Sequence, residues 1–328
     1  MRLTVVVPTL GRDELLHALL NALEAQTLPR ERWSLVVSFD GVAPSTAIGQ
    51  RLRAMGATAA VSAERKGPGA ARNLGARQAT GVVIAFTEDD CIPAPDWLAT
   101  AVARLEREPD LDVLEGATLL PDGSPARRRH GDRLSWLPTN LFVRRDFFER
   151  IGGYCERFFD ARRGIYFRED SDFGFTALEA GARVALDSTP HVVHPREHRG
   201  WLDPIRWARR YEMDPLLALR HPRAFREEIE VVWLGPLRLR RPFVRASVGY
   251  VVALLAAAAA AAIGESGVAA WFLGLAALLV CFLWSKWSLD PRKLPVVLLV
   301  PPVLLAALIR GRVRAYAAGA GAPSSILR

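Results

Sequence analysis

The sequence contains little cysteine, with three residues in 328 at positions 91, 155 and 281. An odd number of widely separated cysteines provides neither a disulfide framework nor the spacing of a cysteine-ligated metal site. A reducing compartment is therefore the simplest interpretation. No signal peptide is expected at the start, because a charge at Arg2 and a proline at Pro8 come too early for one.

Acidic residues are fewer than basic ones, 35 against 43, so the formal net charge is +8. A basic chain suits nucleic acid, an anionic membrane face or a phosphorylated substrate. The arginines gather at 127–133 and at 238–245, and the second group directly precedes an apolar stretch. Neither group lies beside an aromatic platform or a nucleic-acid motif. We therefore expect membrane lipid as a partner and no nucleic acid.

Charge is scarce after residue 245, and this region raises the mean hydropathy of the whole chain to +0.11. Residues 246–263 and 268–284 each approach the length of about 17–25 residues that a membrane span needs. A polar turn at 264–267 separates them, which predicts a helical hairpin. A third stretch, 294–309, contains Pro301 and Pro302 and is either a third span or a kinked, re-entrant element. A buried helical core is the alternative for all three stretches.

Basic residues flank these stretches at 238–245, 286–293 and 310–314. The positive-inside rule places all three groups in the cytoplasm, which favours two full spans and a third element that turns back. We divide the chain into a catalytic domain at 1–200, an amphipathic, interfacial helical segment at 201–245, a transmembrane hairpin plus third apolar segment at 246–309, and a basic cytoplasmic tail at 310–328. The catalytic domain is expected on the cytoplasmic face of the cell (inner or plasma) membrane.

Predicted strands and helices alternate through the first part of the chain. The strands are expected at 3–7, 34–39, 58–61 and 82–86, and the helices at 13–25, 45–55, 69–79 and 95–107. This alternation predicts an α/β fold with a doubly wound, mostly parallel, Rossmann-like sheet. Ligands of such sheets bind at the carboxyl ends of strands, and Asp40 and the triplet Glu88-Asp89-Asp90 both follow such ends.

The acidic triplet has the chemistry of a divalent-metal site. Mg²⁺ takes oxygen ligands and binds well between carboxylates and phosphates, where it offsets the charge of a leaving diphosphate. Glu88 and Asp90 would point the same way in an extended segment. A solvated acidic loop is the alternative. His194 could reach the same metal as a neutral imidazole, although a lone histidine is more often structural.

Two further segments carry charged groups. A glycine-rich run at 67–75 begins a predicted helix, and Lys66 and Arg72 add positive charge for a phosphate; an ordinary glycine turn is the alternative. At 169–172 lie Glu169, Asp170 and Asp172, one of which could accept a proton from an acceptor hydroxyl as a general base. The alternative for these acids is capping of a helix N-terminus.

Several motifs in a fixed order carry a resemblance. They are Val-Val-Val-Pro-Thr at 5–9, Asp-Gly at 40–41, Gly-Pro-Gly-Ala-Ala-Arg-Asn-Leu-Gly at 67–75, Phe-Thr-Glu-Asp-Asp-Cys-Ile-Pro at 86–93, Thr-Asn-Leu-Phe-Val-Arg-Arg at 139–145, Gly-Gly-Tyr at 152–154 and Arg-Glu-Asp-Ser-Asp at 168–172. In this order and spacing, over about residues 1–195, the chain resembles the family 2 glycosyltransferases.

The resemblance implies the A-type fold of nucleotide-diphospho-sugar transferases and an inverting mechanism, in which the acceptor attacks the anomeric carbon directly. It also implies a divalent metal, Mg²⁺ or Mn²⁺. The residues assigned to the metal are Asp90, Glu88 and His194. The residues assigned to the nucleotide-sugar are Pro8, Thr9, Arg12, Asp40, Lys66, Arg72 and Asp89. Asp170 would be the catalytic base, and Glu169 would help to place the acceptor or the sugar.

The chain departs from the family pattern at three positions. The second strand of the family often ends in two aspartates, and the first of them is Phe39 here. The metal motif usually opens with aspartate, and this chain has the longer Glu88. Cys155 stands where an acid is common. Which carboxylate contacts the metal is therefore left open.

We predict an inverting, metal-dependent glycosyltransferase that moves a sugar from a nucleotide-diphospho-sugar to a lipid-linked or other membrane-associated acceptor, in the synthesis of cell-envelope polysaccharide or glycolipid. A sugar nucleotidyltransferase would need similar groups, but it would release diphosphate rather than nucleoside diphosphate. A non-catalytic, membrane-anchored nucleotide-sugar-binding protein is the third hypothesis. The presence of Asp40, Asp90 and Asp170 argues against it.

Overall fold

The computed structural model describes residues 1–126, 134–196, 200–234 and 237–317. The chain divides into two compact units, Met1–Glu197 and His198–Arg328. The arginine group expected at 127–133 and the end of the predicted tail, 318–328, lie outside the described residues.

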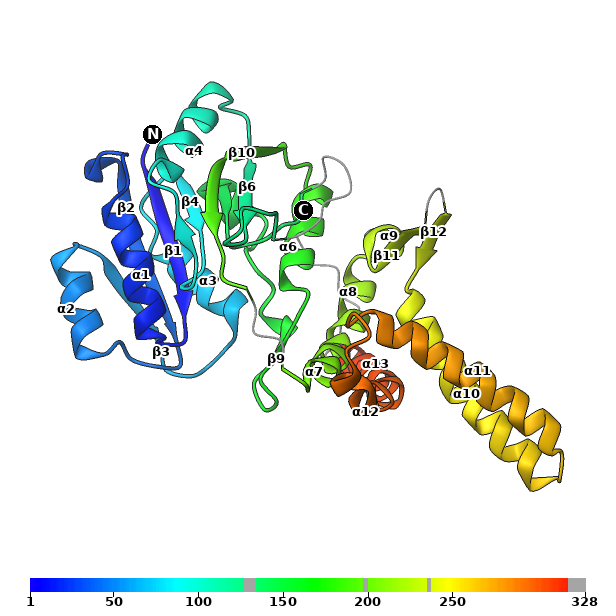
Figure 1. The fold of residues 1–328 in the computed structure, drawn as a ribbon. Coiled ribbons are helices and arrows are strands. Elements are labelled where there is room, and N and C mark those ends of the chain that lie inside the picture. The colour runs from blue at the N-terminus through cyan, green and yellow to red at the C-terminus, as the bar shows by residue number, and fades with distance from the viewer. Residues whose placement is uncertain (127–133, 197–199, 235–236, 318–328) are drawn as a thin grey trace. The chain divides into compact units, whose positions relative to one another are not determined.

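The described part of the first unit is built on an eight-stranded sheet in the order β3-β2-β1-β4-β7-β6-β10-β5 (Figure 1). Its strands are β1 (Leu3–Thr9), β2 (Trp33–Asp40), β3 (Thr58–Ser62), β4 (Val83–Phe86), β5 (Ile92–Pro93), β6 (Val113–Leu119), β7 (Leu141–Arg144) and β10 (Val184–Val193). Strands β1 to β4 are mutually parallel, and β6 is parallel to β10. The predicted mostly parallel α/β fold is confirmed, but β7 and β5 pair in the antiparallel sense, which the apolar pattern did not predict.

Helices pack on both faces of this sheet and bury both of its surfaces. They are α1 (Asp13–Glu24), α2 (Thr46–Ala54), α3 (Pro68–Arg77), α4 (Trp97–Arg107), α5 (Arg145–Arg150) and α6 (Glu169–Glu179). Successive residues of a strand point to opposite faces. Val5 and Val7 of β1 accordingly join a core cluster with α1, α2 and α4, whereas Val6 joins another with α3, α5 and α6. Burial on both faces explains why the strands are continuous apolar runs.

The pairing of the strands brings distant polar segments to one edge of the sheet. Because β2 and β4 flank β1 in the same direction, Thr9, Asp40 and the residues after Phe86 share that edge. The short strands β8 (Phe159–Asp160) and β9 (Ile165–Tyr166) form a separate antiparallel hairpin that leads into α6.

The second unit starts with helices α7 (Asp203–Arg210), α8 (Asp214–Arg220) and α9 (Pro222–Glu228), and then forms a hairpin of β11 (Val231–Leu234) with β12 (Leu237–Arg240). The segment expected to be helical, 201–245, therefore contains a β-hairpin after α9, which the sequence did not predict. Helix α9 ends at Glu228, because Ile229 is extended with a ψ of 128°, and Glu230 follows with a positive φ of 50°. The β-branched Val231 and Val232 that follow favour a strand.

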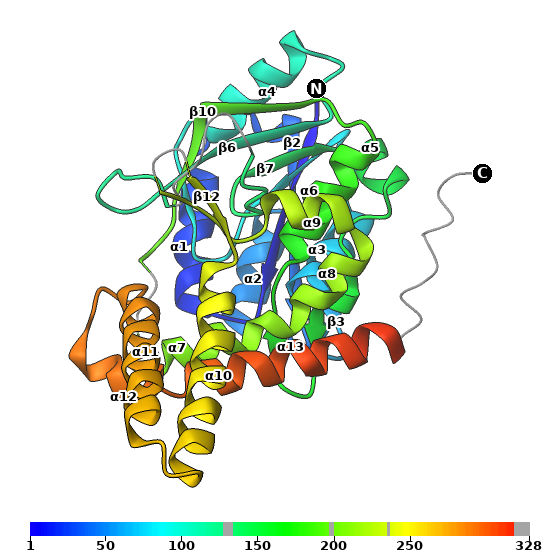
Figure 2. The same ribbon diagram turned by 90° about the vertical axis from the view of Figure 1, so that its right-hand side faces the viewer.

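Helices α10 (Pro242–Ala262) and α11 (Ser266–Ser285) form the predicted hairpin and pack along each other (Figure 2). Each is long and apolar enough to cross a membrane. Many of their apolar side chains are uncovered: Leu255 is 66% exposed and Leu278 is 70% exposed. The alternative of a buried helical core thus does not fit the described residues.

The third apolar stretch is broken into α12 (Leu294–Val297) and α13 (Val300–Ala317), with a bend of 46° between the two parts. The break immediately precedes Pro301 and Pro302, whose rings remove backbone donors from the helix. Residues 310–317, predicted as a tail, continue α13 instead. Arg310 and Arg314 lie 3.5 and 3.9 Å from the carboxylate of Glu212, so this part of α13 packs against η3 (Tyr211–Met213) through charge pairs.

Candidate active site

Asp40 ends β2 and holds the loop that precedes α3. Its buried carboxylate accepts hydrogen bonds from the backbone N–H groups of Lys66, at 2.7 Å, and Gly67, at 2.9 Å. Gly67 has a φ of +89°, a backbone conformation that glycine adopts without strain. The carboxylate therefore fixes the glycine loop at the sheet edge, and each of its oxygens retains a further lone pair for a ligand.

The end of β1 and the loop after it bind the acidic triplet. Thr9 donates from Oγ1 to Asp89 Oδ2 at 2.6 Å, and Arg12 Nε donates to the same oxygen at 3.2 Å. Arg12 Nη2 also pairs with Asp89 Oδ1 and lies 3.0 Å from Asp90 Oδ2. Burial raises the pKa of the Asp89 carboxyl, although Arg12 and Thr9 oppose it. Pro8 is buried within β1, opposite Ser38.

Arg72, on the second turn of α3, connects two acidic segments. Its side chain is 2% exposed, and Nη2 donates to Glu88 Oε1 at 2.7 Å. Nη1 lies 3.9 Å from Glu169 Oε1, and the guanidinium lies 5.3 Å from the ring centroid of Tyr154. Atoms Nε and Nη1 have no hydrogen-bond partner among the described residues. A buried guanidinium with free donors is suited to an anionic ligand.

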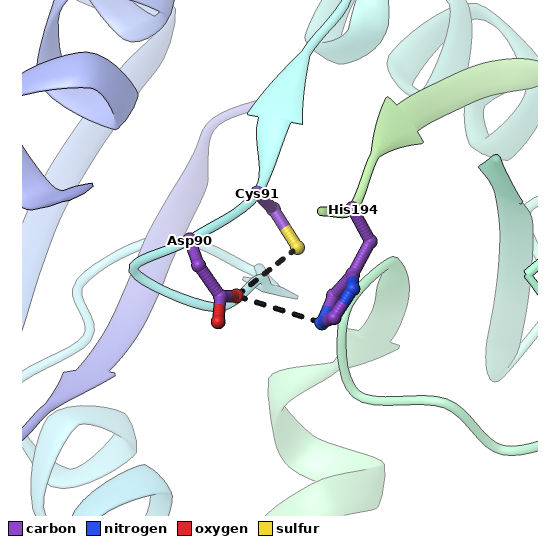
Figure 3. A group of neighbouring side chains, drawn as sticks. All are labelled: Asp90, Cys91 and His194. Atoms are coloured by element: carbon purple, nitrogen blue, oxygen red, sulfur yellow. Dashed lines mark hydrogen bonds and ion pairs between the residues drawn. The ribbon is translucent and has the colours of Figure 1, made fainter. Parts of the chain in front are cut away.

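His194 follows β10 and completes a cluster with the acidic triplet. Its Nε2 lies 3.6 Å from Asp90 Oδ1 (Figure 3). The same nitrogen lies 3.8 Å from Glu88 Oε2. The interaction with Glu88, reinforced by Asp90 and opposed by burial, raises the pKa of the imidazole to about 9. Burial alone would raise the pKa of the Glu88 carboxyl, but His194 and Arg72 outweigh it and lower that pKa. The cluster thus attracts positive charge.

These groups fit a hard divalent cation. Glu88 and Asp90 supply carboxylate oxygens and His194 a nitrogen, which Mg²⁺ or Mn²⁺ accepts. Cys91 Sγ also lies in the group with Asp90 and His194, all within 4.8 Å (Figure 3). However, Cys91 is fully buried, and burial raises the pKa of its thiol well above the ordinary value. A protonated thiol is a poor ligand for these ions, so Cys91 is not assigned to the metal.

The predicted catalytic acids begin α6. Burial, with Asp170 beside it and Arg72 opposing, raises the pKa of the Glu169 carboxyl to about 7. Asp170 is less buried and accepts from Ser171 N at 2.6 Å. The helix begins after Arg168, whose φ of 77° is left-handed and whose side chain makes no capping hydrogen bond. Glu169 and Asp170 lie in the first turn of α6, where the helix dipole favours carboxylates, so the helix-terminus alternative is consistent with the structure.

Sequence reasoning missed two features beside the site. Tyr154 is 2% exposed, stacks on Phe173 at 4.6 Å, and has a hydroxyl without a hydrogen-bond partner in the described structure. The β8–β9 hairpin places Phe159 and Tyr166 opposite each other near Glu169. The Gly-Gly-Tyr motif at 152–154 was the available signal for the first feature. No sequence signal predicted the β8–β9 hairpin, because its strands are only two residues long.

Residues 4–166 match the model of glycosyl transferase family 2. The chain belongs to this family. The glycosyltransferase prediction is thereby confirmed at the level of the family, for the region that contains the acidic triplet and the glycine loop.

Two curated relatives come from Haloferax volcanii. Glycosyltransferase AglE is 25% identical over 193 residues, which are 53% of this chain and 62% of that protein. A glucosyl-dolichyl phosphate glucuronosyltransferase is 30% identical over 111 residues, 28% of this chain and 35% of that protein. The chain thus spans about three fifths of the length of the first relative and about one third of the second.

Solved structures share the fold at low identity. Mannosyltransferase PcManGT from Pyrobaculum calidifontis, solved with GDP-Man and Mn²⁺, is 20% identical with a TM-score of 0.53, over 94% of this chain and 86% of that one. TarS 1–349 from S. aureus, solved with UDP, is 16% identical with a TM-score of 0.52, over 97% and 92% of the two chains. At these identities the likeness establishes the A-type glycosyltransferase fold.

Proposed function

We propose that this protein is a metal-dependent, inverting glycosyltransferase that moves a sugar from a nucleotide-diphospho-sugar to a membrane-associated acceptor. One observation carries the proposal: the buried Arg72 lies between Glu88 of the metal-type cluster and Glu169 of the acidic pair on α6. A cation site for a diphosphate and a carboxylate pair for an acceptor hydroxyl therefore lie within the reach of one side chain.

The metal would be held by Glu88, Asp90 and His194. When bound, it supplies positive charge that stabilises the leaving diphosphate. The raised pKa of His194 supports this assignment, because the same two carboxylates that retain its proton would attract a cation, whose binding requires a neutral imidazole. The Mn²⁺ in the PcManGT structure, which has the same fold, is consistent with it.

The donor would bind along the edge formed by β1, β2 and β4. Asp40 would contact the nucleoside with the lone pairs that its backbone partners leave free, beside Pro8 and Thr9. Arg12 would keep Asp89 in place, since it pairs with that carboxylate already. The positive groups for the diphosphate would be Lys66 and Arg72. Solved members of the fold bind UDP and GDP-Man.

Asp170 would be the catalytic base and Glu169 a positioning residue. The pKa of Glu169, about 7, leaves much of that group protonated at neutral pH, able to donate a hydrogen bond. The acceptor oxygen would bond to the anomeric carbon as the bond from that carbon to the diphosphate breaks. The hydroxyl proton would pass to Asp170, and nucleoside diphosphate would leave. Direct attack of this kind inverts the anomeric carbon.

The acceptor would be a lipid-linked or membrane-associated molecule, at the cytoplasmic face of the cell (inner or plasma) membrane. The uncovered apolar surfaces of α10 and α11 support attachment to a membrane. The Haloferax relative that acts on glucosyl-dolichyl phosphate supports a lipid-linked substrate. Such acceptors serve the synthesis of cell-envelope polysaccharide or glycolipid.

The test is nucleoside diphosphate release by detergent-solubilised protein from a panel of nucleotide-sugars, with a membrane lipid extract as acceptor. Release should require Mg²⁺ or Mn²⁺ and stop on chelation. Glu88→Gln with Asp90→Asn should abolish it, while Asp110→Asn, at a side chain 77% exposed, should not. Release of diphosphate would indicate a nucleotidyltransferase. Tight nucleotide-sugar binding without turnover in the presence of the lipid extract would indicate a non-catalytic binding protein.

A further inference from the structure

We propose that α13 lies in the plane of the membrane, with its outer face at the boundary between the headgroups and the acyl chains of an anionic leaflet. The placement goes beyond the proposed function, because it depends on no donor or acceptor. The sequence left residues 294–309 as a third span or a kinked, re-entrant element, with 310–328 as a cytoplasmic tail. An in-plane helix that continues to residue 317 is none of these.

Helix α13 is apolar on two opposite faces. The inner face is buried, and residues at helical spacing form it: Val300, Leu304, Ala307, Gly311 and Ala315. At about 3.6 residues per turn, the opposite side of the helix carries a second apolar set, here called the outer stripe: Pro302, Leu305, Ile309, Val313 and Tyr316. In the described structure Ile309 is 66% exposed, Val313 65% and Tyr316 59%. A helix that is apolar all round is normally buried, so the outer stripe requires an apolar partner.

The inner face of α13 is fixed to a charged layer. Gly311 approaches η3 so closely that a Cβ at this position would overlap the backbone oxygen of Glu212. Arg310 and Arg314 pair with the buried carboxylate of the same residue. A third full span would carry charged side chains into hydrocarbon, which is costly. The uncharged part of α13, residues 300–309, is also only about 15 Å long, against about 30 Å of hydrocarbon.

Helix α13 crosses the α10–α11 hairpin where the hairpin changes from charged to apolar. Val300 belongs to one core cluster with Ala246 of α10 and Leu283 of α11. Arg245 directly precedes Ala246 in the chain, and Lys286 closely follows Leu283. Basic residues that flank a membrane span lie at the level of the headgroups, so α13 lies at that depth as well.

The direction of α13 fits a helix on the membrane surface. Figure 2 shows α13 running across the hairpin of α10 and α11, and Figure 1 shows α13 nearly end-on. A hairpin that crosses the bilayer therefore places α13 along the membrane plane. Helix α8 packs against α13, and in both views it lies on the opposite side of α13 from the turn between α10 and α11. The outer stripe, away from this packing, thus faces the side on which the hairpin enters lipid.

Charge favours an anionic leaflet over a second copy of the chain. Residues 291–317 contain five basic residues and no acidic one. Arg312 is exposed beside the outer stripe, and its guanidinium lies 5.9 Å from the ring centroid of Tyr316. Arginine and tyrosine join an apolar body to a polar end, which suits the interface. Anionic headgroups complement this charge, whereas two chains packed stripe against stripe would bring their arginines together.

The experiment measures the local depth of the outer stripe, because the hairpin alone would keep the protein on vesicles. The full-length protein carries Cys155→Ser and Cys281→Ser and retains the buried Cys91. Ile309→Cys and Val313→Cys are made separately and labelled with an environment-sensitive fluorophore. The vesicles contain phosphatidylcholine and phosphatidylglycerol. The quenchers are a lipid nitroxide near the headgroup, a lipid nitroxide near the end of the acyl chain, and iodide in water.

Two further labelled positions calibrate the depth. Leu255→Cys is the control for deep lipid, since Leu255 is 66% exposed and lies midway between Arg245 and Glu265 in the chain. Arg223→Cys is the control for water, because the side chain of Arg223 on α9 is 86% exposed. Melting temperatures show which labelled variants fold as the parent does, and the two stripe positions are read independently.

The labels at 309 and 313 should be quenched by the shallow nitroxide at least about twofold more than by the deep one, as for a helix immersed by about 5–10 Å. The label at Leu255→Cys should show the reverse order, and that at Arg223→Cys should respond to iodide alone. A shallow nitroxide on phosphatidylglycerol should quench the stripe labels about twofold more than the same group on phosphatidylcholine. Arg312→Gln should reduce this ratio.

Three results would overturn the proposal. Quenching of both stripe labels by iodide alone would place α13 in water. Stronger quenching by the deep nitroxide would indicate a third span or a re-entrant segment. Protection from all quenchers, lost when the protein is diluted into excess lipid, would show that a second copy covers the stripe. If the label at Leu255→Cys also escapes both nitroxides, the membrane attachment of the hairpin itself is wrong.

Discussion

Arg72 and Glu88 form a 2.7 Å ion pair in which the arginine is 2% exposed and the glutamate 27% exposed. The same guanidinium lies 3.9 Å from Glu169 and faces the ring of Tyr154. A single buried cation therefore separates the metal-type cluster after β4 from the acidic pair on α6. Without it, two carboxylates would share a region with little water.

Arg72→Gln should destabilise the protein by about 2–4 kcal/mol, because removal of one partner leaves the other charges partly buried and uncompensated. Arg77→Gln is the matched control, since Arg77 is an exposed residue on the same helix. Melting temperatures in one detergent give the comparison. Equal effects of the two substitutions would show that the Arg72 pairs contribute little.

Glu169→Gln should raise the melting temperature at pH 8 more than at pH 4.5. Burial and Asp170 raise the pKa of Glu169 from 4.5 to about 7. Between these values the unfolded chain has ionised Glu169 while the folded protein retains the proton, so this group lowers stability as pH rises through that window. The Glu169→Gln substitution removes this loss, which is on the order of 1–3 kcal/mol of unfolding free energy at pH 8.

The control for this pH dependence is Glu179→Gln, at an exposed position near the end of the same helix. It should change the melting temperature by similar amounts at both pH values. A Glu169→Gln effect that is the same at pH 4.5 and pH 8 would mean that Glu169 titrates normally in the folded protein.

Gly67→Ala should be more destabilising than Gly56→Ala, by about 1–2 kcal/mol or more. Both glycines have a positive φ, +89° and +61°, so alanine is strained at each. Only at Gly67 would the new Cβ meet another group, the ring of Phe159 at 2.5 Å, whereas nothing lies within 4 Å at Gly56. Thermal melting of the two variants measures the difference. Equal losses would indicate that the hairpin moves away from the loop freely.

The topology prediction can be tested by cysteine labelling in intact cells. In a background without Cys155 and Cys281, and with the buried Cys91 retained, Glu265→Cys should react with a membrane-impermeant maleimide from outside. Ser288→Cys should react only after permeabilisation. If the bent pair of α12 and α13 turns back, Tyr316→Cys should behave like Ser288→Cys. External labelling at position 316 would instead indicate a third full span.

Most strands and helices of the sheet domain could be predicted from the spacing of apolar residues in short stretches of sequence. The run at 3–7 predicted β1 because both faces of that strand are buried. The same pattern says nothing of strand direction, so the antiparallel β7 was not foreseen. Helical spacing also failed at Val231 and Val232, because the helix ends at Glu228 and these two residues pair with β12 instead.

The candidate site shows the same division between local and long-range information. Asp40 and the acidic triplet could be placed together from sequence, because parallel strands bring their carboxyl ends to one edge. The Arg12–Asp89 pair and the burial of Arg72 join segments far apart in the chain, and no local pattern encodes them. The sequence left open whether His194 is a metal ligand or a structural histidine. The structure brings its side chain close to Glu88 and Asp90.

The most direct test of the central claim is a single-turnover transfer assay with enzyme in excess over a radiolabelled donor. It would compare Asp170→Asn with the wild type at saturating metal and acceptor. We predict that Asp170→Asn retains donor binding and loses transfer by at least about a hundredfold, the typical contribution of a general base. Transfer by Asp170→Asn within a few fold of the wild-type rate would contradict the assignment of the base and, with it, the proposed mechanism.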